Sequence, residues 1–353
     1  MNDAERPPRV SPLGAALLGG TLLVVVLGGA FVARLLSPTQ QPLRHQPIAS
    51  AQPRPIVQIV RQQPGLPDLA DLVDRLCPSI ATIVPRGSAM KSKRDGAAQV
   101  PASTYSADGW LVTSAAALPP MPLDAVFGDG RRANLTDVRS DPVSGLAIVK
   151  ADAAATPLSF SDQLFPRVGQ FGLSMATPAG SGCTASASMI GSDFLADGGG
   201  PSGYVRLRPA PDDWTAGMPL LGTDGRVVGI GMEGQPGALI PAPIASGIID
   251  ELIRNSLSAS TSFGFRTIDY AEPLSSRLGD VRSGAGVALV QAGSSAERAG
   301  LRAGDVITTV DDRPVSGASE LSRLLDAARS KANLTVQRRS GQVQMTVKRS
   351  ASL

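Results

Sequence analysis

A succession of short apolar runs, separated by Gly, Pro and Asp, restricts the central part of this chain to a β-rich fold. Most of these runs are too short for helices, and turn residues at this spacing predict an all-β barrel or sandwich. Only 4% of the residues are aromatic, so Val, Ile, Leu and Ala must fill the core. The runs occupy residues 80–84, 110–113, 125–127, 146–149, 170–173, 185–190, 204–207, 218–230 and 239–241.

Two amphipathic helices and a second, smaller unit surround this region. A helix at 69–76, ending near Pro78, precedes the β-rich part, and a helix at 243–255 closes it. From Ser262 onward we expect a mixed α+β domain. Its elements are strands at 265–268, 286–290, 306–307, 334–338 and 343–347, a one-turn helix capped by Ser294, and a helix at 319–328.

The N-terminal part has a different composition. Residues 1–12 are polar, and residues 13–36 contain an uncharged run from Leu13 to Ala33 that matches the ~20 residues needed to cross a bilayer. We interpret 13–36 as a transmembrane anchor and 1–12 as a cytoplasmic tail; a cleaved signal peptide is the alternative. Residues 37–66 are rich in Pro and Gln and show no apolar period, which predicts an extended linker.

The counts of His and Cys exclude several kinds of chemistry. His45 is the only histidine and lies in the linker, whereas hydrolases that use Ser, Cys or a metal usually need an imidazole. Cys77 and Cys183 have no metal-ligand spacing. They form a disulfide only if the domain is exported, and small buried hydrophobic residues are the favoured interpretation. The net charge of +3 is too small and scattered to indicate nucleic acid binding.

One segment has the outline of a nucleophile loop. Residues 214–220 read Trp-Thr-Ala-Gly-Met-Pro-Leu and resemble the Gly-Asn-Ser-Gly-Gly-Pro-Leu segment of chymotrypsin-fold serine proteases. Segments 107–113, 126–131, 141–150 and 157–169 also resemble that fold, in the same order. Together with the anchor and the C-terminal unit, they make residues 67–348 similar to HtrA/Deg-type proteases. The resemblance implies a chymotrypsin-like double β-barrel over 67–258 and a PDZ domain over 262–349.

The three catalytic positions implied by this resemblance are occupied by other residues. The histidine position holds Ala116, the aspartate position Gly145 and the serine position Ala216. The mechanism needs a hydroxyl, an imidazole and an orienting carboxylate, so none of the three roles is filled. Trp214 stands where the family has the glycine of the oxyanion loop, and a bulky residue there disfavours the geometry that aims an amide at the oxyanion. A substitute pair of Ser114 and Lys150, or Cys183 alone, has no support from spacing.

The C-terminal unit carries the binding activity that the resemblance implies. PDZ domains add a peptide as a strand and hold its terminal carboxylate with backbone amides of an x-Φ-Gly-Φ loop. Ser262-Phe263-Gly264-Phe265 fits this loop, and residues 266–268 would accept the peptide. The expected peptide-binding residues are Ser262, Phe263, Gly264, Phe265, Ile268, Leu321, Leu324 and Leu325. The alternative for the three leucines is that they are core residues.

These observations predict a non-proteolytic, membrane-anchored HtrA-like scaffold or regulator without metal or cofactor. The resemblance implies folded domains in the periplasm, held at the bacterial inner membrane by a single-pass anchor. The expected partners are protein C-termini or extended peptides, active HtrA relatives, and further copies in a homo-trimer. Two alternatives stay open: an HtrA-type serine endopeptidase with residual or rewired activity in envelope protein quality control, and a PDZ domain that only packs against the barrel.

Overall fold

The computed structural model describes residues 68–87, 99–178, 182–192, 203–234, 236–269 and 283–350. The expected tail at 1–12, anchor at 13–36 and linker at 37–66 lie outside these ranges. None of the helices in the described ranges is long and apolar enough to cross a membrane. The first described helix, α2 (Leu69–Leu76), is capped by Asp68, whose side chain accepts a hydrogen bond from the Ala70 amide at 3.0 Å. It continues into the short 3₁₀ helix η1 (Cys77–Ser79).

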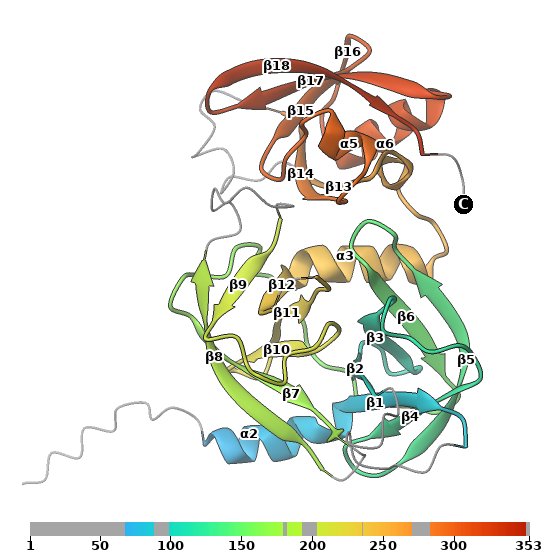
Figure 1. Cartoon of the computed structure of the whole chain (residues 1–353), viewed down its shortest axis with the longest axis vertical. Helices are drawn as coiled ribbons and strands as arrows, with labels where there is room; N and C mark the ends of the chain where they lie inside the picture. The colour runs from blue at the N-terminus through green and yellow to red at the C-terminus, as the bar shows by residue number, and fades with distance from the viewer. Residues whose placement is uncertain are drawn as a thin grey trace, which may run out of the picture. The chain divides into compact units, whose positions relative to one another are not determined.

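Six antiparallel strands close the first barrel, drawn in blue to green in Figure 1. Their order around the barrel is β1-β2-β3-β6-β5-β4. Two of them, β2 and β5, were not predicted. The first contains Pro101 and small polar residues, and the second alternates two buried residues, Ala133 and Leu135, with exposed polar ones. The strands are β1 (Ile80–Pro85), β2 (Val100–Thr104), β3 (Trp110–Ser114), β4 (Leu123–Phe127), β5 (Arg132–Ser140) and β6 (Leu146–Ala151).

A second closed barrel follows, with the order β10-β11-β12-β9-β8-β7. The predicted double β-barrel is therefore present. Helix α3 (Ala242–Ile253) follows β12 directly, and its buried Ile and Leu side chains belong to the same apolar cluster as those of both barrels. The strands are β7 (Phe171–Ala176), β8 (Thr184–Ser192), β9 (Val205–Arg208), β10 (Pro219–Gly222), β11 (Val227–Gly231) and β12 (Ala238–Pro241).

The C-terminal unit, orange to red in Figure 1, is one antiparallel sheet with three short helical elements. The strand order is β13-β14-β15-β17-β18, with β16 paired to β15, so among the described strands β13 has a partner on one side only. As predicted, the Ser294 hydroxyl caps its one-turn helix by accepting the Glu297 amide at 3.1 Å. The elements are η4 (Ala259–Phe263), β13 (Phe265–Asp269), β14 (Ala285–Val290), α5 (Ser295–Arg298), β15 (Val306–Val310), β16 (Arg313–Pro314), α6 (Ala318–Ala327), β17 (Lys331–Arg338) and β18 (Gly341–Lys348).

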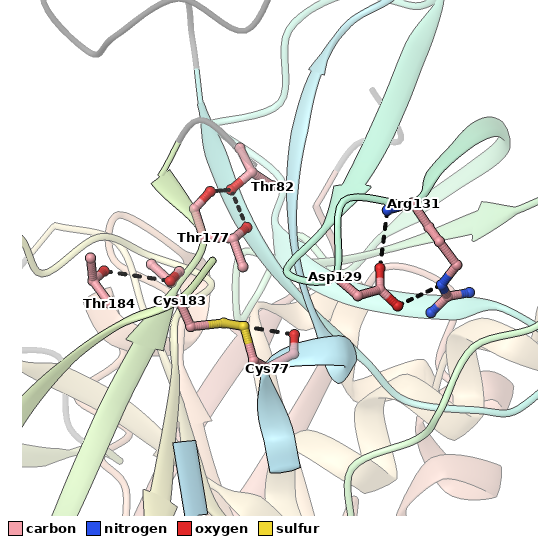
Figure 2. The surroundings of a disulfide bond; sticks show 8 residues. Cys77, Thr82, Asp129, Arg131, Thr177, Cys183 and Thr184 are labelled. Carbon is pink, nitrogen blue, oxygen red and sulfur yellow. Dashed lines mark hydrogen bonds and ion pairs between the residues drawn. A yellow bond between two sulfur atoms is a disulfide. The ribbon is translucent and has the colours of Figure 1, made fainter. Parts of the chain in front are cut away.

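A disulfide joins the two barrels, which corrects the interpretation of Cys77 and Cys183 as unpaired hydrophobic residues (Figure 2). Cys77 precedes the first barrel and Cys183 precedes β8 of the second, with Cα atoms 5.7 Å apart across a sequence separation of 106. A Cβ atom on Gly128 would lie 2.4 Å from the Cys77 sulfur, so this position has room only for glycine. The fold, rather than local spacing, brings the two cysteines together.

A buried hydrogen bond lies close to the disulfide. The hydroxyl of Thr82, on β1, donates to the carbonyl of Thr177, just after β7, at 2.6 Å, and the two hydroxyls are 2.8 Å apart. Both threonines are buried, so breaking this contact would leave unsatisfied polar groups inside the protein. The junction between the barrels therefore combines a covalent link with satisfied polar contacts.

Arg266 on β13 connects the C-terminal unit to the barrels. Its guanidinium is 3% exposed and donates from Nη2 to the fully buried carboxylate of Asp141 at 2.7 Å. It also forms an ion pair with Glu251 of α3. Burial alone would lower the pKa of Arg266, but the charges of Asp141 and Glu251 outweigh it and hold the pKa above its ordinary value. The guanidinium therefore stays charged and bridges three segments distant in sequence.

Removing the disulfide should destabilise the double barrel. Because the closed loop is long, the Cys77→Ser/Cys183→Ser variant is expected to lose about 2–5 kcal/mol of unfolding free energy. Denaturant unfolding of the oxidised wild type, the DTT-treated wild type and the double variant measures the loss. Equal unfolding midpoints for all three would contradict a stabilising bond between the barrels.

Removing the buried Asp141 carboxylate should lower the unfolding free energy more than removing an exposed carboxylate. Asp141→Ala leaves Arg266 without its most buried partner, and a loss of about 3–5 kcal/mol is expected. Asp108→Ala is the matched control, since its ion pair with Lys150 involves an aspartate side chain that is 65% exposed and should be worth less than ~1 kcal/mol. Similar losses for both variants, measured by denaturant unfolding, would argue against the bridging role of Arg266.

Candidate functional site

The fold brings the three expected catalytic positions close together. Ala116 lies in the turn after β3, and the neighbouring Ala115 amide donates to the carbonyl of Gly145 at 2.8 Å. From the second barrel, Gly217 lies so close to β3 that a Cβ atom on it would be 2.9 Å from the Ser114 amide nitrogen. Ala216, Gly145 and Ala116 therefore belong to three loops in contact at one place.

The loop before β6 is held by Asp141 and not by the residue at the aspartate position. The Gly145 amide donates to the Asp141 carbonyl at 3.0 Å, and the Asp141 carboxylate accepts the Ser144 amide at 2.8 Å. Gly145 has a φ of +72°, and a Cβ atom there would meet nothing within 4 Å. The loop thus has space for a side chain at 145 but adopts a backbone conformation that favours glycine.

The loop that contains Ala216 has a well-defined shape because of its packing. Gly217 has a φ of +91° and donates its amide to the Gly231 carbonyl at 2.8 Å. A side chain at 217 would collide with Pro101 as well as Ser114. These contacts explain the glycine and the turn without any catalytic role. Pro219 and Leu220 then enter β10, where both are buried.

Trp214 occupies the position whose backbone amide would be expected to stabilise an oxyanion. Its amide donates to the Pro211 carbonyl at 3.0 Å, so this donor is used inside the loop. The indole lies against Gly231, where an added Cβ atom would be 2.9 Å from Cζ2, and its buried Nε1 has no hydrogen-bond partner among the described residues. An oxyanion hole needs free amides directed at the reacting oxygen. The sequence indicated an obstruction at Trp214 but not the bond to Pro211.

Ser114, Lys150 and Cys183, the substitutes considered from the sequence, do not form a nucleophile–base pair in the described part of the chain. Ser114 pairs with Leu146 and Lys150 with Trp110, at opposite ends of the β3–β6 ladder, which places Ser114 and Lys150 about 13 Å apart at ~3.3 Å per residue. The Lys150 ammonium binds the Asp108 carboxylate at 2.7 Å. Cys183 is in the disulfide and has no thiol. Among the described residues, no group of three or more His, Cys, Asp or Glu could hold a metal ion.

Most of the expected peptide-binding residues lie in one apolar cluster of the C-terminal unit. Phe263, Phe265, Leu321, Leu324 and Leu325 pack together and are at most 4% exposed. Ser262 is partly exposed next to them, and Gly264 adopts a φ of +87° while its amide donates to the Thr261 carbonyl at 3.0 Å.

Ile268 differs from the other expected peptide-binding residues. It packs against the cluster that contains the barrel and α3 side chains, and not with the phenylalanines and leucines. The alternation of side chains along β13 places Ile268 on the same side as Arg266, which explains the contact. The structure therefore separates Ile268 from the remaining candidate groove residues.

Comparison with known proteins matches the C-terminal unit to a domain family and finds relatives over most of the chain. A PDZ domain family model matches residues 286–338. The probable periplasmic serine endoprotease DegP-like of Rhizobium meliloti is 30% identical over 246 residues, which cover 65% of this chain and 49% of that protein. The periplasmic pH-dependent serine endoprotease DegQ of Escherichia coli is 23% identical, with 74% of this chain and 65% of DegQ covered.

Among solved structures, the serine endoprotease from Yersinia pestis aligns with a TM-score of 0.47 and 19% identity, covering 80% of this chain and 97% of that one. The chain spans about half the length of the DegP-like relatives from Rhizobium and Brucella. The sequence relatives and the PDZ match agree with the two closed barrels and the C-terminal sheet. The chain is therefore similar to HtrA/DegP-like serine proteases over most of its length, with a double β-barrel followed by a C-terminal unit that matches a PDZ domain.

Proposed function

We propose that this chain is a non-proteolytic member of the family that binds extended peptide segments through its PDZ domain. One observation carries the proposal: the three catalytic positions meet at one place, where they are occupied by Ala116, Gly145 and Ala216. No side chain there can attack a carbonyl, accept the proton or orient an imidazole. The bond between Trp214 and Pro211 also occupies an amide that the oxyanion would need.

Peptide binding is supported by the free side of β13. This strand pairs only with β14 within the described sheet, and α6 lies beside it, since the Asp269 carboxylate accepts the Ala318 amide at 2.9 Å. PDZ domains add a peptide strand at such an edge. The expected peptide-binding residues Phe263, Phe265 and the leucines of α6 are buried in the hydrophobic core beneath this edge.

The disulfide and the relatives support a periplasmic location of the folded domains. Disulfides persist in oxidising compartments such as the bacterial periplasm, and the relatives from Rhizobium, Brucella and Escherichia coli are named periplasmic endoproteases. An inner-membrane anchor at 13–36 is part of the proposal and rests on the sequence alone. Binding to active relatives and assembly into a homo-trimer are likewise proposals.

An endopeptidase with residual activity is the second candidate. Its support is that the curated relatives are named serine endoproteases. This candidate requires a nucleophile outside the three catalytic positions, and within the described residues neither Lys150 nor Cys183 is placed to supply or activate one. The geometry of the site therefore favours the non-proteolytic function.

A protease assay separates these candidates. Purified full-length chain is expected neither to cleave unfolded casein nor to react with a serine-directed fluorophosphonate probe, at a level above a mock purification. The Rhizobium DegP-like relative, treated identically, serves as the positive control. Cleavage or labelling that co-purifies with the chain through successive columns would refute the non-proteolytic proposal.

Peptide binding can be tested with two glycine variants that share the same backbone strain. Gly264 and Gly300 both have a φ of +87°, but a Cβ atom at 264 would lie 2.3 Å from Ser294 Cβ, whereas at 300 it meets nothing within 4 Å. Gly264→Ala should distort the expected carboxylate loop and weaken binding to a C-terminal peptide library by about tenfold or more, ~1.4 kcal/mol. Gly300→Ala should bind like the wild type.

Equal peptide binding by Gly264→Ala and Gly300→Ala would indicate that the peptide does not bind at the loop at 262–265. No saturable binding by the wild type would favour a PDZ domain that only packs against the barrels. These variants are preferred to a charged residue at Phe265, because that side chain is fully buried and its replacement by Asp would unfold the domain.

A further inference from the structure

The strand β18 forms an open edge of the C-terminal sheet. It lies at the end of the strand order opposite to β13 and, among the described strands, pairs only with β17 (Figure 1). The ladder between β17 and β18 runs from the pair Lys331–Lys348 to the pair Arg338–Gly341 without a shift in register. Shifts do occur in the pairs β13–β14 and β15–β17 of the same sheet. The edge is therefore long and regular.

This edge lacks the features that usually prevent another strand from pairing. Natural edge strands are protected by proline, by bulges or by charged side chains. Residues 341–347 contain neither proline nor a charged residue, and Lys348 at the end is the only charged residue of β18. A further strand could therefore be added along most of its length.

Contacts at the end of β18 show which of its backbone groups point away from β17. In an antiparallel ladder, successive residues direct their N–H and C=O groups alternately toward the partner strand and away from it. The Arg349 amide donates toward the β17 side, to the Ser330 carbonyl at 2.8 Å. The Lys348 amide points the other way and donates to the Ser295 hydroxyl of α5 at 2.7 Å. Counted back in steps of two from Lys348, the other outward groups belong to Gln342, Gln344 and Thr346.

The side chains of these three residues are exposed, uncharged and able to pair with their own kind. A glutamine amide both donates and accepts hydrogen bonds. The Thr346 hydroxyl donates to the Asn333 side chain at 2.8 Å and keeps its oxygen as an acceptor. Both the backbone and the side chains of this edge thus match a strand of the same sequence.

We propose that β18 pairs antiparallel with β18 of a second copy of this chain, about a two-fold axis at Gln344. In this register Gln344 lies opposite Gln344 of the second copy, and Gln342 lies opposite Thr346 of the second copy. Each opposed pair exchanges two N–H···O bonds, so the outward backbone groups of all three residues are satisfied. Lys348 lies opposite Ser340, which avoids an opposed pair of like charges.

The limits of the open edge favour a second copy over an unrelated peptide. The edge is bounded at one end by the turn at Arg339-Ser340 and at the other by the contact of Lys348 with Ser295. Gln344 is the middle of the three residues between these limits, so a strand with the same limits fits it exactly once, about a two-fold axis. This symmetry differs from that of the proposed homo-trimer, and the contact does not depend on peptide binding at β13.

Cross-linking tests this geometry directly. The two cysteines of the chain are joined in the disulfide, so an added cysteine is the only target for a maleimide. In the proposed pair, two residues 344 have Cα atoms about 5.5 Å apart, whereas two residues 333 are separated by three strand spacings, about 14 Å or more. Full-length Gln344→Cys treated with bismaleimidoethane should give about tenfold more covalent dimer than Asn333→Cys, because only its thiols are held close together.

Sedimentation equilibrium of the full-length chain provides the second measurement. Gln344→Pro removes the central donor from each copy but leaves the amides that face β17, a position that tolerates proline at an edge. Its dimer dissociation constant should rise about tenfold or more. Gln344→Thr is the matched control, because it keeps the amide and suits a strand, and it should dimerise like the wild type. Thermal melting shows whether each variant is folded.

Three outcomes would overturn the inference. They are a monomeric wild type, equal cross-linking at 344 and 333, and an unchanged dissociation constant in folded Gln344→Pro. The cross-linking comparison decides the matter even if Gln344→Pro does not fold. None of these outcomes bears on the proposed peptide binding, since β13 lies at the opposite edge of the sheet.

Discussion

The buried charge of Arg266 is the interaction that connects the separate parts of this protein. A guanidinium shielded from water must be compensated by opposite charge, and here Asp141 and Glu251 provide it. Asp141 simultaneously organises the loop around Gly145, and Glu251 belongs to the helix that covers both barrels. The β13 strand, the loop around Gly145 and α3 are thus held by one set of charges, and none of them can shift without exposing or separating those charges.

This arrangement gives the loop around Gly145 a structural role that is independent of catalysis. Its shape depends on the Asp141 carboxylate, which accepts the Ser144 amide and binds Arg266. The loop around Ala216 is similarly determined by close packing, because Gly217 touches the end of β3. Both loops can therefore keep the backbone shape of a protease site without selection for catalytic activity.

Much of the fold could be predicted from the sequence because its strands alternate with strong turn signals. The strands β2 and β5 could not be predicted. Pro101 is untypical of a strand in β2, and exposed polar residues in β5 leave only two buried apolar side chains as a signal. The pairing of Cys77 with Cys183 depends on the closure of two barrels. The correspondence of positions 116, 145 and 216 to the expected catalytic positions could be inferred from the motifs. The contacts of Arg266 could not, because each partner is brought near by tertiary structure alone.

The bond from the Trp214 amide to the Pro211 carbonyl has a consequence for any attempt to restore proteolysis. Histidine, aspartate and serine placed at 116, 145 and 216 would rebuild the side chains of a triad. The amide of Trp214 would still be turned to Pro211, and removal of one oxyanion donor costs about 10²–10³-fold in kcat. Gly145 would also have to give up a positive φ that suits glycine. On the proposed non-proteolytic function, the backbone at Trp214 and Gly145 would also oppose catalysis, so three point substitutions would not be enough to restore it.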